Sequence, residues 1–248
     1  EGYGQTESSS FISIDAFNGA STGTVGHISP AIEVKLVDRP DVGCVNKNPS
    51  PGGEICYRGA SMMKGYFKRP ELTKQIIDDE GFLHTGDIGV FTTELNLKIV
   101  DRASNIFKLH QGEFIAPDRL EIAYTSSPLI SNIFITADSN FDYCIGFIEP
   151  NMKLLKDKSG QADTTDAELC SSFEAKILLY TELVRIAKEN GFSRLEVPGN
   201  IFIDKTSFEA NGLLTPTLKT KRLVAKNFYF GKLHELYGEP RLCYGDYN

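Results

Sequence analysis

The chain has 248 residues and a formal net charge of −7; 41% of its residues are hydrophobic and 24% are charged. This length suffices for one large or two modest domains with a buried core. The negative charge argues against a general nucleic-acid binder, which needs a basic face, and no apolar run approaches the roughly 20 residues of a membrane span.

The first part of the chain is predicted to be rich in β-strands. Residues 31–38 and 54–59 alternate apolar and polar side chains, as half-buried strands do, and a Pro-Gly-Gly turn precedes the second. We expect a helix over 70–78 that begins at Pro70. A backbone N–H at the first position of a helix has no partner within the helix, so a proline loses nothing there. Two short strands are expected at 97–102 and 105–109.

The second part is predicted to mix helices and strands. We expect a helix after Pro117, strands at 132–138 and 143–150, and one long helix from about Asp166 to Asn190, capped by Gly191. The polar stretch 151–166 is typical of a surface loop or a partly helical connection. This alternation predicts a small α+β or α/β domain, and the change in composition near residue 101 is the best domain boundary.

The five cysteines are odd in number and scattered, without a C-x-x-C pair. We interpret them as reduced, mostly buried thiols of a protein in a reducing compartment. The first four residues have neither the basic nor the apolar region of a signal peptide, and they open inside a motif. We therefore expect the chain to be a piece of a longer protein.

Two segments in the first part could bind a nucleotide. Gly2-Tyr3-Gly4-Gln5-Thr6-Glu7 combines glycines that let a ligand approach the backbone, an aromatic ring that can stack on a base, and oxygens that can hold Mg²⁺. His84-Thr85-Gly86-Asp87 offers a carboxylate after a tight turn, which could accept both hydroxyls of a ribose. The alternatives are a simple turn for the first segment and an Asx turn for the second.

Two further segments carry charge. Residues 101–121 place Asp101, Arg102 and Glu121 around an apparent hairpin turn at Gly112, and the alternative is a plain hairpin with a solvated ion pair. Residues 214–222 gather cations beside a proline, which suits a mobile loop that brings a lysine to an anion, but also a solvated face. The glycine-rich stretch 18–26 lacks the G-K-[ST] ending of a phosphate loop and is better explained as a strand connection.

The order of the motifs is more specific than any one of them. G-Y-G-x-T-E, G-G-E-I followed by G-Y, T-G-D, D-R, K-x-x-x-G-E, P-x-x-x-E and a late lysine loop span almost the whole chain. This series resembles that of the adenylate-forming ligases. The segments HTGDIG, DRASNIFKLHQGEFIAP and NGLLTPTLKTKR resemble the long-chain fatty acyl-CoA synthetases of eukaryotes within that superfamily.

The resemblance implies a ligase that joins a long-chain fatty acid to CoA through an acyl-adenylate, with ATP and CoA as substrates, AMP as a product and Mg²⁺ as cofactor. It implies that Tyr3 stacks on adenine beside Gly4, that Thr6 hydrogen-bonds the phosphates, and that Glu7 is the Mg²⁺ ligand. Asp87 is implied to accept the ribose hydroxyls.

The resemblance also implies roles around a hinge. Arg102 would contact the ribose, and Lys219 would be the catalytic lysine that bridges the carboxylate and the α-phosphate during adenylation. Lys108 would belong to the loop that replaces Lys219 for thioester formation, and Gly112 would line the pantetheine passage. Ser104 departs from the family, which has lysine or aspartate at that position.

By resemblance, residues 1–100 form the β-rich end of a large N-terminal domain, and residues 101–248 form a small, mobile α+β C-terminal domain. The phosphate loop and the fatty-acid tunnel of the family lie upstream of the first motif, so we expect the chain by itself to be inactive. The alternatives are an adenylate-forming ligase for another carboxylic acid and a non-catalytic binding module. The resemblance further implies a cytoplasmic protein with peripheral membrane association of the whole molecule.

Overall fold

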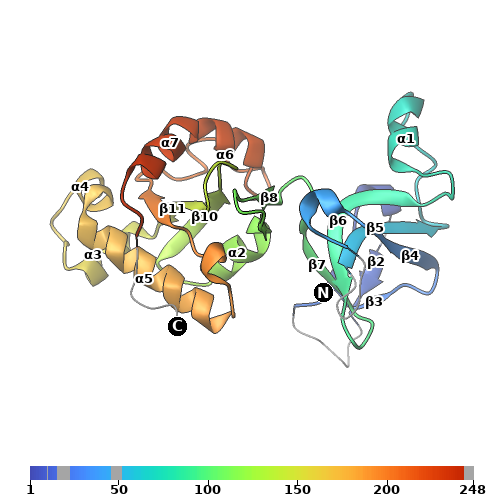
Figure 1. Ribbon diagram of the computed structural model, residues 1–248, viewed down its shortest axis with the longest axis horizontal. Coiled ribbons are helices and arrows are strands. Elements are labelled where there is room, and N and C mark those ends of the chain that lie inside the picture. Colours follow the sequence, from blue (N-terminus) through green and yellow to red (C-terminus); the bar gives the residue numbers. More distant parts are fainter. Residues whose placement is uncertain (10, 16–22, 46–51, 243–248) are drawn as a thin grey trace. The chain divides into compact units, whose positions relative to one another are not determined.

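The computed structural model describes residues 1–9, 11–15, 23–45 and 52–242 (Figure 1). The chain divides into two compact units, Glu1–Ile106 and Phe107–Asn248. The first is built mostly of strands and the second mixes helices with strands, which confirms the predicted α+β class. No helix in the described residues has both the length and the apolar character needed to cross a membrane.

The first unit contains two antiparallel sheets, with strand orders β1-β2-β3 and β4-β5-β6-β7. Its elements are β1 (Gly2–Gly4), η1 (Thr6–Ser8), β2 (Phe11–Ile14), β3 (His27–Ile28), β4 (Ile32–Val37), η2 (Pro40–Val42), β5 (Gly52–Gly59), α1 (Pro70–Ile76), β6 (Leu83–Phe91) and β7 (Leu97–Arg102).

The core of the first unit lies on the inner strands β5 and β6. Ile55 and Tyr57 of β5 are fully buried, and Ile12, Tyr57 and Leu83 join one hydrophobic cluster that packs the two sheets together. Glu54 and Cys56, which alternate with them, are buried as well, so β5 is covered on both faces and is not the half-buried strand that its period of two predicted. The described part of the glycine-rich stretch 18–26 connects β2 to β3, and residues 18–22 lie outside the described residues.

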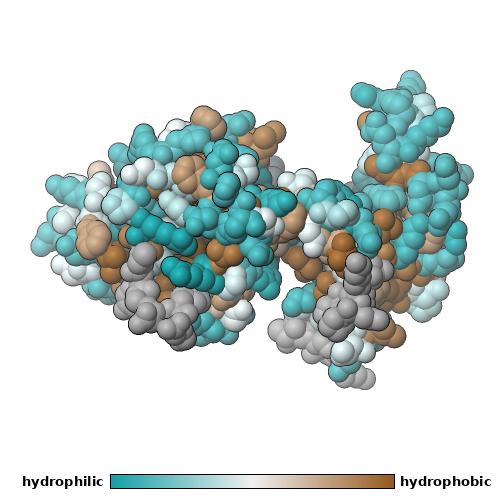
Figure 2. Space-filling view, viewed as in Figure 1, coloured by the Kyte–Doolittle hydropathy of each residue, from teal (hydrophilic) through white to brown (hydrophobic). Residues whose placement is uncertain are grey.

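The segment that carries α1 projects from the sheet of the first unit, and its surface in Figure 2 is largely hydrophilic. Where it returns to the sheet, Asp78 accepts hydrogen bonds from the backbone N–H of Phe82 (2.8 Å) and from Nζ of Lys35 (3.0 Å). Burial alone would raise the pKa of Asp78, but these two donors outweigh it and lower that pKa to about 2.

The second unit contains the three-stranded sheet β10-β11-β12, in which β10 and β11 are antiparallel and β11 and β12 parallel, and the hairpin β8-β9. Its elements are β8 (Phe107–Lys108), β9 (Phe114–Ile115), α2 (Pro117–Tyr124), β10 (Ile130–Thr136), β11 (Ile145–Pro150), α3 (Met152–Ser159), α4 (Asp166–Ser171), α5 (Phe173–Glu189), η3 (Arg194–Glu196), β12 (Asn200–Ile203), α6 (Arg222–Phe228) and α7 (Phe230–Gly238).

Helices cover both faces of this sheet. Ile133 and Ile135 of β10 belong to the hydrophobic cluster formed with α2, α3, α4 and α5. Phe134, between them, belongs to a second cluster with Tyr229 and Leu233 of the C-terminal helices. Both faces of the sheet are therefore apolar, which explains the nearly continuous hydrophobic run of this strand.

One prediction for the second unit was wrong in detail. The single helix expected from 166 to 190 is two helices, because Ser172 adopts an extended conformation (φ −76°, ψ 141°) and its hydroxyl caps α5 by accepting from the N–H of Ala175. The stretch 151–166 is the partly helical connection of the two alternatives predicted, with α3 capped by Asn151.

The structure describes four of the five cysteines, and Cys243 lies outside the described residues. All four are free thiols. Cys56 and Cys144 are buried, whereas Cys44 and Cys170 are half-buried.

Candidate active site

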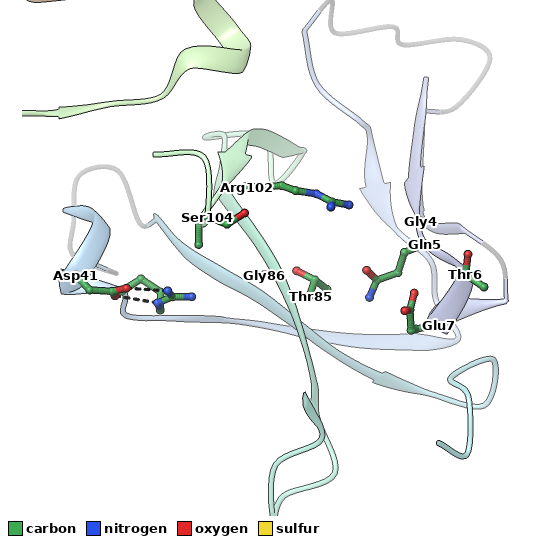
Figure 3. Close-up of a pocket in the computed structure, with 11 residues that line it drawn as sticks. Gly4, Gln5, Thr6, Glu7, Asp41, Thr85, Gly86, Arg102 and Ser104 are labelled. Carbon is green, nitrogen blue, oxygen red and sulfur yellow. Dashed lines mark hydrogen bonds and ion pairs between the residues drawn. The ribbon is translucent and has the colours of Figure 1, made fainter. Parts of the chain in front are cut away.

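A cleft of about 800 Å³ opens on the first unit between the β1 end of one sheet and the β6–β7 edge of the other. Its lining is mostly polar, and it brings together residues far apart in the sequence: Gly4, Gln5, Thr6, Glu7, Arg39, Asp41, Thr85, Gly86, Arg102, Ala103 and Ser104. In Figure 3, the side chains of Gln5, Glu7 and Arg102 point toward a common space beside Thr85. The volume is within the range of small-molecule sites, roughly 300–1,000 Å³.

Tyr3 and Asp87 are not among the lining residues of this cleft, whereas their neighbours Gly4 and Gly86 are. The phenol of Tyr3 donates a hydrogen bond of 2.7 Å to Oδ2 of Asp87, and Nε of Arg102 lies 3.3 Å from Oδ1. Burial, followed by the charge of Asp87, raises the pKa of Tyr3, so the phenol remains a donor. Three residues with predicted nucleotide roles are therefore linked by one hydrogen bond and one ion pair.

The turn before Asp87 lies inside β6. The alternative predicted for this segment was an Asx turn. Gly86 has a φ of +74°, and the hydroxyl of Thr85 accepts from the N–H of Asp87 (3.0 Å) and donates to the carbonyl of Ile55 (2.8 Å). The pairing of β5 with β6 shifts register at this point. The segment is thus a bulge that turns the residues around Asp87 toward the cleft.

Glu54 holds this bulge in place, a role that the sequence analysis did not predict. Its Oε1 accepts from the N–H of Gly86 (2.9 Å), and its Oε2 accepts from Arg39 (3.1 Å). Ligand atoms of Glu54, Cys56 and His84 lie within 4.8 Å of one another. Burial raises the pKa of Cys56 to about 12, so it is a neutral thiol, and the group serves as a polar support for the bulge.

Thr6 and Glu7 enter the cleft from a short 3-10 helix. The hydroxyl of Ser8 accepts from the N–H of Gln5 (3.0 Å) and donates to its carbonyl (2.8 Å), which closes this turn and fixes the residues within it. Oε1 of Glu7 accepts a hydrogen bond of 2.8 Å from the phenol of Tyr66. Mg²⁺ is usually bound by one or two carboxylates together with phosphate oxygens and water, so the carboxylate of Glu7 fits a magnesium ion.

Lys108 and Gly112 lie on the hairpin of the second unit. The N–H of Leu109 donates to the carbonyl of Glu113 (2.8 Å), and Gly112 occupies the turn with a φ of +101°. The hairpin expected around Gly112 is confirmed. A side chain at this position would be strained by the backbone conformation rather than by contact, because an added Cβ meets only the Lys108 side chain, at 3.8 Å.

Lys219 lies at an exposed turn of the second unit. The N–H of Thr215 donates to the carbonyl of Lys219 (2.8 Å), and the N–H of Lys219 donates to the hydroxyl of Thr215 (3.0 Å). The buried residue Leu213 accepts from the N–H of Lys221 (2.7 Å) and ties the turn to the core. The turn therefore presents the lysine side chain to solvent on a fixed backbone.

Arg222 follows this turn as the first residue of α6, and its side chain forms ion pairs with α2. Its guanidinium donates to Oδ1 of Asp118 and, at 2.6 Å, to Oε2 of Glu121, whose Oε1 accepts from the N–H of Ile135 (2.7 Å). The arginine and the glutamate side chains are only 18% and 12% exposed. Glu121 ends the P-x-x-x-E motif and Arg222 ends the segment NGLLTPTLKTKR, but their pairing was not predicted from the sequence.

The comparisons with known proteins extend these observations. The profile of a family described as AMP-binding enzyme matches residues 1–67. The chain is 36% identical to long-chain-fatty-acid–CoA ligase 6 of Homo sapiens over 96% of this chain and 34% of that protein. It is 38% identical to the peroxisomal long chain acyl-CoA synthetase 7 of Arabidopsis thaliana over 96% of this chain and 35% of that one. The chain thus spans about a third of the length of these relatives.

Solved structures with the same fold include two adenylation domains of bacterial reductases. The adenylation domain of a carboxylate reductase from Mycobacterium chelonae has a TM-score of 0.76 and 32% identity, over 89% of this chain and 34% of that one. The A domain of the carboxylic acid reductase from Segniliparus rugosus, in complex with AMP and a co-purified carboxylic acid, has a TM-score of 0.75 and 32% identity, over 88% of this chain and 34% of that one.

Proposed function

Because the chain belongs to the adenylate-forming enzymes and its relatives are long-chain-fatty-acid CoA ligases, we propose that it is part of an ATP-dependent ligase that makes long-chain acyl-CoA. The observation that carries this proposal is the similarity to such ligases over 96% of the chain. The polar cleft supports it, because its carboxylate, hydroxyl and guanidinium groups are suited to a nucleotide and its cation.

In the first half-reaction the fatty carboxylate attacks the α-phosphate of ATP, and pyrophosphate leaves. A magnesium ion held by Glu7 would offset negative charge on the phosphates, and Thr6 would donate a hydrogen bond to them. Asp87 and Arg102 would bind the ribose hydroxyls, with Tyr3 and Gly4 against the adenine. The ammonium of Lys219 would stabilise the negative charge that develops between the carboxylate and the α-phosphate.

In the second half-reaction the thiol of CoA attacks the acyl carbonyl, and AMP leaves. The hairpin that carries Lys108 and Gly112 would replace Lys219 beside the reacting atoms. A glycine suits a narrow passage for the pantetheine arm, since it adds no side chain. By this proposal the first unit is the end of a large domain and the second unit is its mobile partner.

The test is fatty-acid-dependent acyl-CoA formation by the full-length protein that contains this chain, with adenylation and thioester formation measured separately. We expect Lys219→Ala to lose adenylation by a factor of about 100 or more while it still converts supplied acyl-adenylate. Lys226→Ala, which removes another exposed lysine of the same unit, is the matched control and should leave both steps intact. Equal loss of both steps in Lys219→Ala would refute the role of this lysine.

A second candidate is an adenylate-forming enzyme for another carboxylic acid, because the two reductase domains above share 32% identity with the chain. A panel of acids distinguishes the candidates: preference for palmitate over aryl and short-chain acids supports the fatty-acid ligase, and the reverse supports the second candidate. Absence of any acid-dependent use of ATP would leave a non-catalytic binding module. Peripheral membrane association of the whole protein is tested by its sedimentation with lipid vesicles.

A further inference from the structure

Tyr66 contacts Glu7, one of the residues that line the cleft, and the proposed function gives Tyr66 no role. Its phenol donates to Oε1 of Glu7 at 2.8 Å, across 59 positions in the sequence. Within the described part of the chain, the other carboxylate oxygen, Oε2, accepts no hydrogen bond. The contact therefore occupies one carboxylate oxygen and leaves the second to the cleft that Glu7 lines.

The loop that carries Tyr66 also holds the backbone of Glu7. The N–H of Met63 donates to the carbonyl of Glu7 at 2.8 Å. The loop thus contacts this residue at two points, through its main chain and through its carboxylate. Two contacts to one residue fix its orientation better than either contact alone, because they restrict rotation of both the backbone and the side chain.

Tyr66 itself is held by its neighbours. Its N–H donates to the hydroxyl of Thr73 at 2.9 Å, and its carbonyl accepts from the N–H of Arg69 at 3.1 Å. The preceding Gly65 has a φ of +146°, and a Cβ there would lie 2.8 Å from Cγ2 of Thr73. The close packing of the loop against the start of α1 therefore depends on a glycine and determines where the phenol lies.

Packing does not explain why this residue is a tyrosine. Its side chain is not in the core, since Tyr66 is 37% exposed, and its neighbour Phe67 is 87% exposed. The feature that distinguishes tyrosine from phenylalanine here is the hydroxyl, and its contact is Glu7.

We propose that Tyr66 is a positioning residue that orients the Glu7 carboxylate toward the magnesium ion of the nucleotide complex. The proposal rests on the proposed function through the assignment of Glu7 as a metal ligand. A donor that binds one oxygen of a ligating carboxylate fixes the direction of the other, and loss of such a donor typically weakens metal binding by about 10- to 100-fold. The loop that carries Tyr66 thereby becomes part of the nucleotide site.

The test measures binding of a non-hydrolysable ATP analogue to the full-length protein while Mg²⁺ is titrated. For Tyr66→Phe we expect the Mg²⁺ concentration at half-maximal binding to rise about tenfold, with nucleotide affinity at saturating Mg²⁺ within about twofold of wild type. Phe67→Ala, which alters the same loop at a side chain that faces solvent, is the matched control and should leave the Mg²⁺ dependence unchanged. Thermal unfolding of each variant reports any general loss of stability.

A double variant separates positioning from a purely structural effect. In a Glu7→Gln background, Tyr66→Phe should have no further effect on the Mg²⁺ dependence, because the two side chains act through one contact. An unchanged Mg²⁺ dependence in Tyr66→Phe alone, or an equal effect in both backgrounds, overturns the proposal. So does a Glu7→Gln variant with the Mg²⁺ dependence of wild type.

The Mg²⁺ titration and the fatty-acid assay together distinguish failure of this proposal from failure of the proposed function. If the wild type binds the analogue in a Mg²⁺-dependent manner that requires Glu7 and Tyr66 but activates no fatty acid, the positioning role stands and the ligase proposal fails. If it activates fatty acids and Tyr66→Phe binds Mg²⁺ as the wild type does, the ligase proposal stands and the positioning role fails.

Discussion

The buried ion pair of Arg222 yields the sharpest prediction about stability. Arg222→Met keeps an unbranched, apolar stem at this position but removes both donors to Glu121 and Asp118. The Asp118 side chain is 42% exposed, so its loss as a partner costs about 0–1 kcal/mol. The loss of the partner of Glu121 costs more, because the Glu121 side chain is only 12% exposed and, when ionised, would be a buried charge without a cationic partner.

We expect Arg222→Met to destabilise the second unit by about 3 kcal/mol near pH 10, the low end of the range for breaking a buried pair. Burial raises the pKa of Glu121 to about 8, although Arg222 and the N–H of Ile135 act against it, and removal of Arg222 raises that pKa further. The wild type and the variant differ in the cost of ionising Glu121 only above the wild-type pKa, because below it the carboxyl is protonated in both folded proteins. The difference in the free energy of unfolding should therefore shrink to about 1 kcal/mol near pH 6, where Glu121 is protonated in both.

The assay is denaturant unfolding at both pH values, with hydrogen exchange of the peptide over β10 as a local readout, since the N–H of Ile135 donates to Glu121. Arg222→Met combined with Glu121→Gln should recover most of the stability near pH 10, because the amide has no charge to bury. A deficit that is equal at the two pH values, or that persists in the double variant, would refute the buried-charge reasoning.

Three further predictions follow from local geometry. Tyr3→Phe removes the 2.7 Å hydrogen bond to Asp87 and should weaken AMP binding about five- to tenfold by calorimetry, with a smaller effect on 2′,3′-dideoxy-AMP; equal losses for both nucleotides would contradict a ribose role. Gly65→Ala should lower the free energy of unfolding by about 2 kcal/mol, because of its positive φ and the 2.8 Å approach to Thr73, and unchanged chemical denaturation would count against the strain. Because the pKa of Asp78 is lowered to about 2, its stabilising contribution is present above about pH 4 and lost as the pH falls toward 2. The stability difference between wild type and Asp78→Asn should shrink over that window in acid unfolding, and a constant difference would show that the charge is not responsible.

The sequence by itself determined the elements whose signals are local. The period of two in residues 31–38 and 54–59 appears as β4 and β5, and Pro70 and Pro117 begin α1 and α2 as expected. These predictions succeed because strand alternation and helix starts depend on neighbouring residues. The division of the long helix at Ser172 was missed, since the apolar pattern continues across a residue whose hydroxyl caps the next helix.

Only the tertiary structure decided which distant side chains meet. The motif order singled out Tyr3, Glu7 and Asp87 as candidates, but not that Tyr3 donates to Asp87 or that Tyr66 donates to Glu7. Nor could spacing pair Arg222 with Glu121, which lie 101 residues apart. The physical reason is that such contacts are set by how sheets and helices pack, a property of the whole fold that no local period or short motif encodes.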